Sequence, residues 1–328
     1  MKFGIFGGAR QKRGLADTDS PTGYRDWIEY SIEAEALGYH STFTTEHHFT
    51  GLGQVSASLN LLTYLAAKTT TLRLGTAVMT LPWHNPILLA EQAATLDLVS
   101  DGRLDFGIGK GYRYNEFNGF DIDMADADAI FEEAFSLILK AWQNEERWSH
   151  QGARWQFNDI VVEPPVVQKP HPPIWLAAGR PQSIRAAARI GAHLLLDQYS
   201  PLKVALERAD IFRDELATMG VDPAARQIAL ARGLFIAKNQ AEKAAVIERR
   251  TKSRGLVDEL AQTPEGDNSA SIMQFKGPEE AIDGALIGTL DEIHERLDAI
   301  RAGGIEYVLL SNAGGGTEGL RTFSREFH

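Results

Sequence analysis

The stretch LRLGTAV, residues 72–78, decides the fold when it is considered with its two neighbours along the chain. This short run of mostly apolar and small residues predicts a strand, and Asn85-Pro86 supplies the N-cap and first-turn proline of a helix that ends near Val99. A second strand, 104–109, follows the turn at 100–103. A strand, a helix and a further strand in this order predict a parallel β-α-β unit.

The same alternation continues along the whole chain. Capping pairs at Asn239–Glu242 and Thr289–Glu292 predict two later helix starts. Eight strand–helix repeats favour an α/β fold, a (β/α)8 TIM barrel with insertions, as one domain over residues 1–328. An open doubly wound sheet is the weaker alternative, because no strand is followed by Gly-x-Gly-x-x-Gly. The other predicted strands are 3–6, 41–45, 174–177, 193–196, 228–236 and 307–310, and the other predicted helices include 24–37, 55–68, 129–142, 181–190 and 202–219.

Two segments interrupt this alternation. Residues 148–173 contain five prolines and several aromatic residues, which predicts a small β insertion with extended connections. Residues 266–288 are rich in Gly, Pro and polar residues and have no clear period. A long irregular stretch inside a compact domain is typical of a mobile loop or lid.

The composition excludes several classes of function. A net charge of −11 argues against nonspecific binding to nucleic acid or to an anionic membrane. The chain has no cysteine, so thiolate catalysis, iron–sulfur clusters and disulfides are excluded. No apolar run approaches the ~20 residues that span a bilayer. The opening residues 1–6 suggest a strand rather than a signal peptide, so we expect a cytoplasmic protein.

Glu46-His47-His48 is the most informative group of titratable residues, because it follows the strand 41–45 directly. In a barrel of this kind the reactive face lies at the carboxyl ends of the strands. Adjacent strand residues point in opposite directions, so the two histidines are poorly placed to share a metal ion, and we expect no catalytic metal. A polar strand end with histidines bonded to the backbone is the alternative interpretation of this group.

Two turns after neighbouring strands are suited to an anion. Gly107-Ile108-Gly109-Lys110-Gly111-Tyr112 combines glycines with a lysine, although it is not a P-loop. Ala178-Gly179-Arg180 precedes the helix that starts at Pro181. Each turn alone is typical of an ordinary βα connection. Together they can converge on one phosphate group through backbone N–H groups and cations.

These residues, in this order and spacing, resemble the bacterial luciferase-like flavin-dependent monooxygenases, and the match covers nearly the whole chain. The motifs that carry the resemblance are Met1-Lys2-Phe3-Gly4, Glu46-His47-His48-Phe49-Thr50, Leu74-Gly75-Thr76-Ala77-Val78 with Leu81-Pro82, Leu96-Asp97-x-x-Ser100-x-Gly102-Arg103, Gly107-Ile108-Gly109-Lys110-Gly111 and Lys169-Pro170-x-Pro172-Pro173-Ile174-Trp175. The resemblance implies reduced FMN at the carboxyl face of the barrel. Such enzymes react reduced flavin with O2 to give a flavin C4a-(hydro)peroxide, which oxygenates a small organic substrate.

The resemblance also assigns roles to residues. His47 matches the catalytic histidine, as general base or hydrogen-bond partner, and His48 is expected to be structural. Ala77-Val78 matches a non-proline cis peptide against the flavin ring, and Lys110 falls where luciferase has a phosphate-binding arginine. The implied cofactor-binding residues are Thr76, Ala77, Val78, Lys110, Gly111, Tyr112, Ala178, Gly179 and Arg180.

The chain departs from the luciferase pattern at several of these positions. Lys110 supplies a point charge rather than a planar fork, and Ala178-Gly179 replaces Glu-Ser. Gln198 stands where luciferase has a tryptophan on the substrate side, so light emission with a long-chain aldehyde is not expected. The residues expected to line a mostly apolar substrate pocket are Phe6, Glu46, Trp83, His84 and Gln198.

The sequence and the resemblance also predict partners for this protein and leave two alternative functions open. The chain has no nicotinamide-binding fingerprint, so reduced flavin is expected from a separate NAD(P)H-flavin reductase. A homodimer through the helices 55–68 and 85–99 is expected from the family. One alternative is an F420-dependent oxidoreductase that transfers hydride without O2, although the acidic chain is poorly suited to a polyanionic cofactor tail. A non-catalytic flavin-binding relative is the other alternative, and the presence of His47 argues against it.

Overall fold

Eight parallel strands close into a barrel in the computed structural model, which describes residues 1–11, 22–266, 270, 272, 274 and 277–327. Closure follows from the pairing of β10 with β9 on one side and β12 on the other, and from the pairing of β12 with β1. This arrangement confirms the predicted (β/α)8 barrel. The strands in order around it are β1 (Lys2–Gly7), β2 (Ser41–Thr44), β3 (Arg73–Thr76), β5 (Leu104–Gly109), β8 (Ile174–Ala177), β9 (His193–Leu196), β10 (Ile228–Ile236) and β12 (Tyr307–Asn312).

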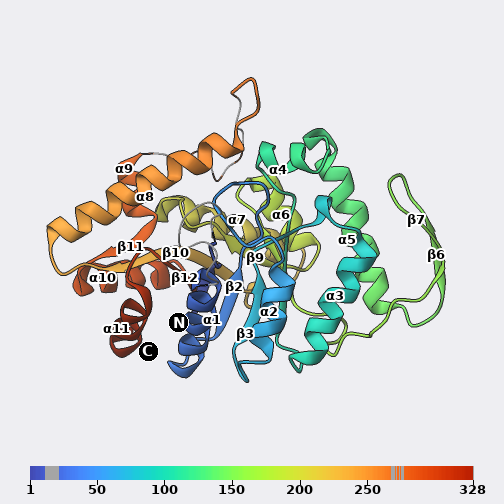
Figure 1. Cartoon of the computed structure of the whole chain (residues 1–328), viewed down its shortest axis with the longest axis horizontal. Coiled ribbons are helices and arrows are strands. Elements are labelled where there is room, and N and C mark those ends of the chain that lie inside the picture. The colour runs from blue at the N-terminus through green and yellow to red at the C-terminus, as the bar shows by residue number, and fades with distance from the viewer. Residues whose placement is uncertain (12–21, 267–269, 271, 273, 275–276, 328) are drawn as a thin grey trace.

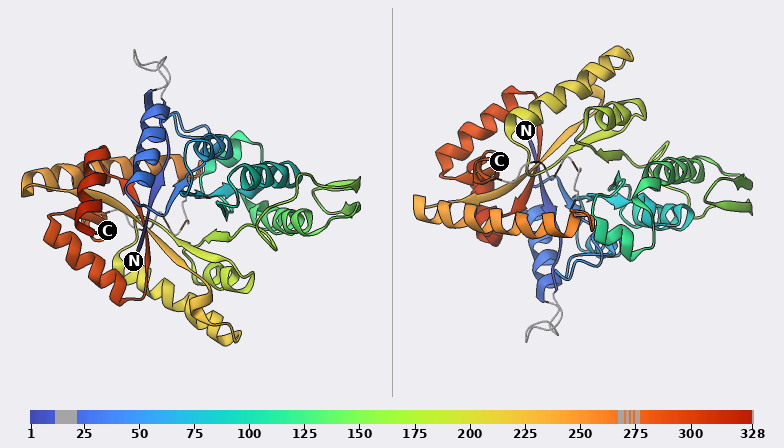
Figure 2. Two further views of the ribbon diagram at one scale, coloured as in Figure 1. Left: turned by 90° about the horizontal axis from the view of Figure 1, so that it is seen from below. Right: turned by 90° about the horizontal axis from the view of Figure 1, so that it is seen from above.

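Helices surround the barrel strands on the outside (Figures 1 and 2). Most of them bury an apolar face against the sheet, as a parallel barrel requires. Thr289 and Glu292 form the predicted capping box at the start of α10. The helices of the outer layer are α1 (Thr22–Ala36), α2 (Ser58–Ala66), α3 (Pro86–Val99), α5 (Ala127–Gln143), α6 (Pro181–Arg189), α7 (Leu202–Thr218), α8 (Gln240–Ala261), α10 (Leu290–Ala302) and α11 (Gly316–Phe327).

The barrel interior is a packed core of its own. Phe43, Trp175 and Tyr307 meet edge to face inside it, with ring centroids 5.6 to 6.4 Å apart. Gly75 makes room for this cluster, because a Cβ atom there would lie 2.4 Å from the Phe43 ring. These side chains therefore fill this part of the barrel interior, and a large cavity lies toward the carboxyl ends of the strands.

The strand predicted at 72–78 is shorter in the structure. It ends at Thr76, and a cis peptide bond between Ala77 and Val78 separates it from β4 (Met79–Thr80). β4 pairs with β5 through Met79 and Ile108. The chain thus changes direction at the end of the third barrel strand, at the position that the resemblance identified.

Part of the segment predicted as irregular, 266–288, has regular structure. Pro278–Asp283 forms α9, and Ala285–Gly288 forms β11, a buried strand that pairs with β10 outside the barrel. Backbone pairing with an existing strand overrides the weak local preference there. Residues 267–269, 271, 273, 275 and 276 of the predicted loop lie outside the described residues.

The predicted insertion at 148–173 contains the antiparallel pair β6 (Trp148–Gln151) and β7 (Gln156–Ile160). Figure 1 shows this hairpin projecting from the side of the barrel beyond α5. A short helix that the sequence did not predict, α4 (Tyr114–Gly119), follows β5 at the carboxyl face. In the described part of the chain, no helix combines the length and apolar character needed to cross a membrane.

Candidate active site

A cavity of about 1500 Å³ opens at the carboxyl ends of the barrel strands. Residues from the ends of β1, β2, β5, β8 and β9 line it, together with residues of α4, α6 and α8. Pockets for small ligands usually enclose about 300–1,000 Å³. The space is therefore large enough for a cofactor and a small second molecule. The position agrees with the general location of active sites in (β/α)8 barrels.

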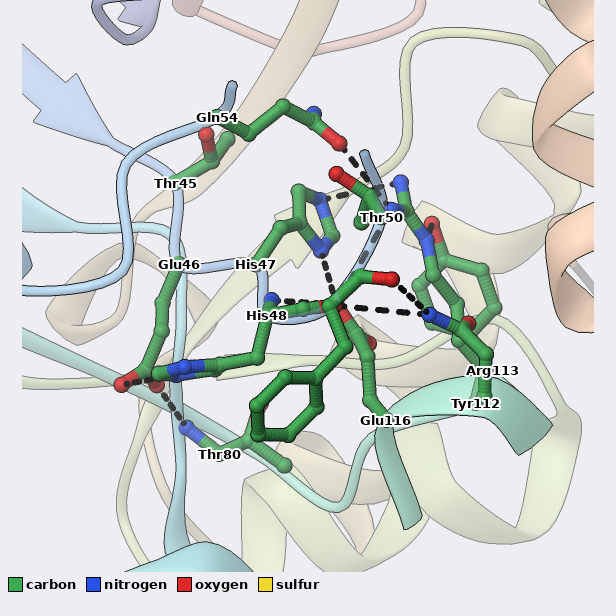
Figure 3. A network of polar contacts seen from close by, with 12 residues as sticks. Thr45, Glu46, His47, His48, Thr50, Gln54, Thr80, Tyr112, Arg113 and Glu116 are labelled. Carbon is green, nitrogen blue, oxygen red and sulfur yellow. Dashed lines mark hydrogen bonds and ion pairs between the residues drawn. The ribbon is translucent and has the colours of Figure 1, made fainter. Parts of the chain in front are cut away.

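His47 lies at this cavity with both ring nitrogens engaged (Figure 3). Its Nδ1 lies 3.0 Å from Oε1 of Glu116, and its Nε2 lies 3.1 Å from Nη2 of Arg113. A guanidinium can only donate, so Nε2 accepts from Arg113. The single proton of a neutral ring is then on Nδ1 and faces the carboxylate. Together these two contacts select one tautomer of His47.

The pKa of His47 is lowered from its ordinary value. Burial is the largest cause, and the positive charge of Arg113 lowers the pKa further. The hydrogen bond and the charge of Glu116 act in the opposite direction but do not outweigh burial. The imidazole is therefore neutral near pH 7, with an unprotonated Nε2, which is the form that can accept a proton.

Glu116 and Arg113 are themselves held firmly. Both side chains are almost fully buried. Glu116 also accepts a hydrogen bond from the backbone N–H of His48, at 2.9 Å. Arg113 donates to Oε1 of Gln54 and to the hydroxyl of Tyr112, each at 3.2 Å. These contacts fix the orientation of the two groups that bracket His47.

The sequence did not predict Arg113, Glu116 or Gln54 as site residues. Arg113 is the N-cap residue of α4 and Glu116 lies in its first turn, so the unpredicted helix is what places them. One signal was available. An arginine and a glutamate three residues apart follow directly on the glycine-rich turn at 107–112, at a strand end.

Glu46 forms a second layer behind His47. Its carboxylate accepts hydrogen bonds from Nε2 of His84 at 2.8 Å, from the backbone N–H of Thr80 at 2.9 Å and from Nε2 of His48 at 3.3 Å. Burial acts to raise the pKa of Glu46, but the hydrogen bonds outweigh it and the pKa is lowered. The ring of His48 packs edge-on against Trp83, as suits the structural role expected of it.

The groups expected to hold a flavin line the same cavity. Val78 follows the cis bond and packs against Gly109, where a Cβ atom would come within 2.6 Å of Val78 Cγ2. Lys110 reaches the cavity but forms an ion pair with Asp128, with 2.6 Å between Nζ and Oδ1. Arg180 is the N-cap residue of α6, and it lines this cavity together with Gln182 and Ser183 from the first turn of that helix.

Most residues that the sequence predicted for the site line this one cavity. Two lie elsewhere. Thr76 lies within the barrel wall, where its hydroxyl donates to the carbonyl of Gly107 at 2.7 Å, and His84 lies behind Glu46. The predicted residues that line the cavity are Phe6, Glu46, His47, Ala77, Val78, Trp83, Lys110, Gly111, Tyr112, Ala178, Gly179, Arg180 and Gln198.

No group of three or more His, Asp and Glu side chains within the described ranges is arranged to bind a metal ion. His47 and His48 turn to different carboxylates, Glu116 and Glu46.

Three known proteins are similar to this chain in sequence or in fold. A flavin-dependent trigonelline monooxygenase, oxygenase component, from Acinetobacter baylyi is 27% identical over 298 residues, which cover 86% of this chain and 81% of that protein. The crystal structure of the monooxygenase RslO1 from Streptomyces bottropensis superposes with a TM-score of 0.85 at 25% identity, over 100% of this chain and 98% of that one. An F420-dependent secondary alcohol dehydrogenase shares the fold, with a TM-score of 0.80 at 16% identity over 99% and 98% of the two chains.

The family model described as luciferase-like monooxygenase matches residues 1–307. The resemblance inferred from the sequence motifs is therefore confirmed over nearly the whole chain. Taken with the closed barrel and the histidine at its carboxyl face, this match establishes that the chain belongs to the luciferase-like monooxygenases.

Proposed function

We propose that this protein is the oxygenase of a two-component monooxygenase, which takes reduced FMN from a separate NAD(P)H-flavin reductase and uses O2 to oxygenate a small organic molecule. The observation that carries the proposal is the neutral His47, held between Glu116 and Arg113 at the edge of a large cavity. The related trigonelline monooxygenase is named as an oxygenase component, which supports a separate reductase.

The residues around the cavity fit a flavin mononucleotide. The start of α6, with Arg180, and the nearby Lys110 offer N–H groups and cations for a phosphate. Ala77 and Val78 provide an apolar surface for a ring system. Asp128 is an unfavourable neighbour, because it pairs with Lys110 and would compete with a phosphate. When bound, reduced FMN would supply the electrons that activate O2.

The chain itself would contribute proton transfer at His47. Nε2 is the nitrogen that can accept a proton, and Arg113 must withdraw its Nη2 before Nε2 is free. Glu116 would stabilise the imidazolium that forms, because its carboxylate already accepts the Nδ1 proton. Arg113 therefore has two roles: its charge adds to burial in keeping the resting imidazole neutral, and it protects the base until a ligand displaces it.

The alternative is an F420-dependent hydride transfer, which the shared fold of the F420-dependent alcohol dehydrogenase keeps open. Titration with FMN and with F420 separates the two proposals. We expect FMN to bind more tightly, and reduced FMN mixed with air to show a transient absorbance that His47→Asn diminishes. Tight F420 binding without any FMN transient would replace the proposal by the alternative. Rapid reduction of bound FMN by NAD(P)H without a reductase would contradict the two-component arrangement.

A homodimer through α2 and α3 is part of the proposal. Tyr64 on α2 and Leu88 on α3 are large apolar side chains that are more than half exposed. Exposed apolar groups on adjacent helices favour a protein interface. Sedimentation equilibrium is expected to give a dimer for the wild type and a monomer for Leu88→Glu. A monomeric wild type at micromolar concentration would contradict this part.

A further inference from the structure

Helix α8 turns an unusual face toward the cavity. Val246, Arg249, Arg250, Ser253 and Val257 all line it, at the intervals of three and four residues that place side chains on one helix face. The helix follows β10 and reaches α4 at the open end of the barrel (Figures 1 and 2). Two arginines thus lie in the middle of a helix face that is otherwise small or apolar.

Arg250 extends across the end of the barrel wall. Its Nη2 donates to the backbone carbonyl of Gln198 at 2.5 Å, and its guanidinium lies 5.0 Å from the centre of the Tyr199 ring. Gly233 makes this path possible, since a Cβ atom there would lie 2.4 Å from Arg250 Nη1. The side chain is therefore held over the cavity by backbone and aromatic contacts rather than by a carboxylate.

Positive charge is in excess around Arg250. The nearby carboxylate, Asp197, is already paired with Arg208 at 2.7 Å. Arg232, which is buried, donates to the backbone carbonyl of Asp197. In the described part of the chain, neither Arg249 nor Arg250 has a carboxylate within ion-pair distance, and Nε of Arg250 is buried without a hydrogen-bond partner. Arg249 is exposed, whereas Arg250 is partly buried. A partly buried cation without an anion is costly, and an anionic ligand at Arg250 would reduce that cost.

This positive region is separate from the groups that fit the FMN phosphate. Lys110 follows β5 and Arg180 follows β8, whereas Arg250 lies over β10, two strands beyond β8 around the barrel. Two anion-binding regions at different strand ends of one cavity fit two different ligands. The planar fork of an arginine is matched by the two oxygens of a carboxylate.

We propose that Arg250, assisted by Arg249, binds a carboxylate of the molecule to be oxygenated, so that the substrates are small organic acids. The inference rests on the proposed function, because it assumes that the second anion region faces the substrate. The same anion chemistry could instead serve the phosphate of FMN or the acidic tail of a deazaflavin, and the experiment separates these sources.

The test measures binding rather than turnover. Benzoate and its neutral isostere benzamide are titrated into the FMN-loaded protein by isothermal calorimetry. Arg250→Gln, Arg249→Gln and the charge-preserving Arg250→Lys are compared with Arg147→Gln, which removes an exposed arginine remote from the cavity. Because the Arg250 side chain also contacts Gln198 and Tyr199, thermal unfolding of each variant is recorded first.

We expect benzoate to bind at least about 10-fold more tightly than benzamide to the wild type. Arg250→Gln should abolish this preference, Arg249→Gln should reduce it, and Arg250→Lys should retain part of it. FMN affinity and the control variant should remain within about twofold of the wild type. Equal binding of the two probes to wild type, or an unchanged preference in folded Arg250→Gln, would overturn the inference.

The other sources give different patterns. If the arginine variants lose affinity for FMN but keep their affinity for riboflavin, the region binds the cofactor phosphate and the inference is overturned. If the arginine variants lose affinity only for F420, the region binds the acidic tail of the deazaflavin, and the inference is likewise overturned. If FMN fails to bind at all but benzoate still binds through Arg250, the proposed function fails while the carboxylate site remains.

Discussion

Replacing the two charged partners of His47 one at a time is expected to move its titration in opposite directions. Glu116 raises the pKa of His47 through its hydrogen bond and charge, so Glu116→Gln should lower that pKa further. Arg113 lowers it, so Arg113→Gln should raise it. His47 must be neutral to accept a proton. The acid limb of the rate profile should therefore move to lower pH in Glu116→Gln and to higher pH in Arg113→Gln.

The size of the rate effect follows from the contacts. Hydrogen bonds to charged groups contribute about 1.5–3 kcal/mol. At about 1.4 kcal/mol for each tenfold change, loss of the bond between Glu116 and His47 Nδ1 corresponds to a decrease of about 10- to 150-fold in a rate limited by proton transfer. His47→Asn should show a larger loss, since it removes the base itself. Arg113→Gln should decrease the rate less than Glu116→Gln, because it also frees Nε2 of His47.

Two assays check the reasoning independently. The ¹⁵N shifts of the imidazole report the titration and tautomer of His47 without turnover, and oxidation of protein-bound reduced FMN by O2 reports the rate profile. Glu133→Gln is the matched control, since it removes a carboxylate from another histidine, His150, 3.1 Å away at the insertion. Shifts in the same direction for both variants, or a protonated Nε2 in the resting protein, would refute the account.

Three further outcomes are expected. Burial lowers the pKa of His193 to about 4. Between pH ~6.5 and ~4 the unfolded chain therefore binds more protons than the folded protein, so the free energy of unfolding should decrease by up to about 3 kcal/mol as the pH falls through this window. Urea unfolding at several pH values should show a smaller decrease for His193→Asn. Asp128→Asn should tighten FMN binding about 2- to 5-fold and leave riboflavin binding unchanged, because it releases Lys110 to bind the phosphate. Equal effects on FMN and riboflavin would argue against a phosphate site at Lys110. Gly75→Ala should destabilise the protein by about 1–3 kcal/mol, since its Cβ would overlap a core phenylalanine ring. Gly255→Ala on the exposed side of α8 should instead stabilise it by about 0.5–1 kcal/mol. If chemical denaturation showed that both variants change the free energy of unfolding in the same direction, this packing argument would be contradicted.

Local patterns were sufficient for most of the barrel. The run at 104–109 is a strand with those limits, and Asn85 accepts hydrogen bonds from the first N–H groups of α3, as its position before a proline predicted. The prediction was less accurate where pairing partners are distant in the chain. Residues 285–288 become a strand only because β10 offers an edge, and that pairing cannot be inferred from four residues.

In the active site, too, some residues could be predicted from local sequence and others could not. His47 is identifiable from its place after a strand, because the barrel brings every strand end to one face. Glu116 and Arg113 are 69 and 66 residues away, and only the position of α4 brings them to the two nitrogens of its ring. A tautomer and a lowered pKa depend on these distant partners and on burial, which local sequence does not encode.

The amino-acid sequence by itself determined the alternation of strands and helices, the family and the histidine at a strand end, because periodicity, capping and motif spacing are properties of neighbouring residues. Only the tertiary structure decided that Lys110 is paired with Asp128, that Thr76 belongs to the wall, and that Arg250 lies at the cavity with no carboxylate partner among the described residues. Charge balance in a cavity is a sum over groups from many elements, and it exists only once those elements have packed together.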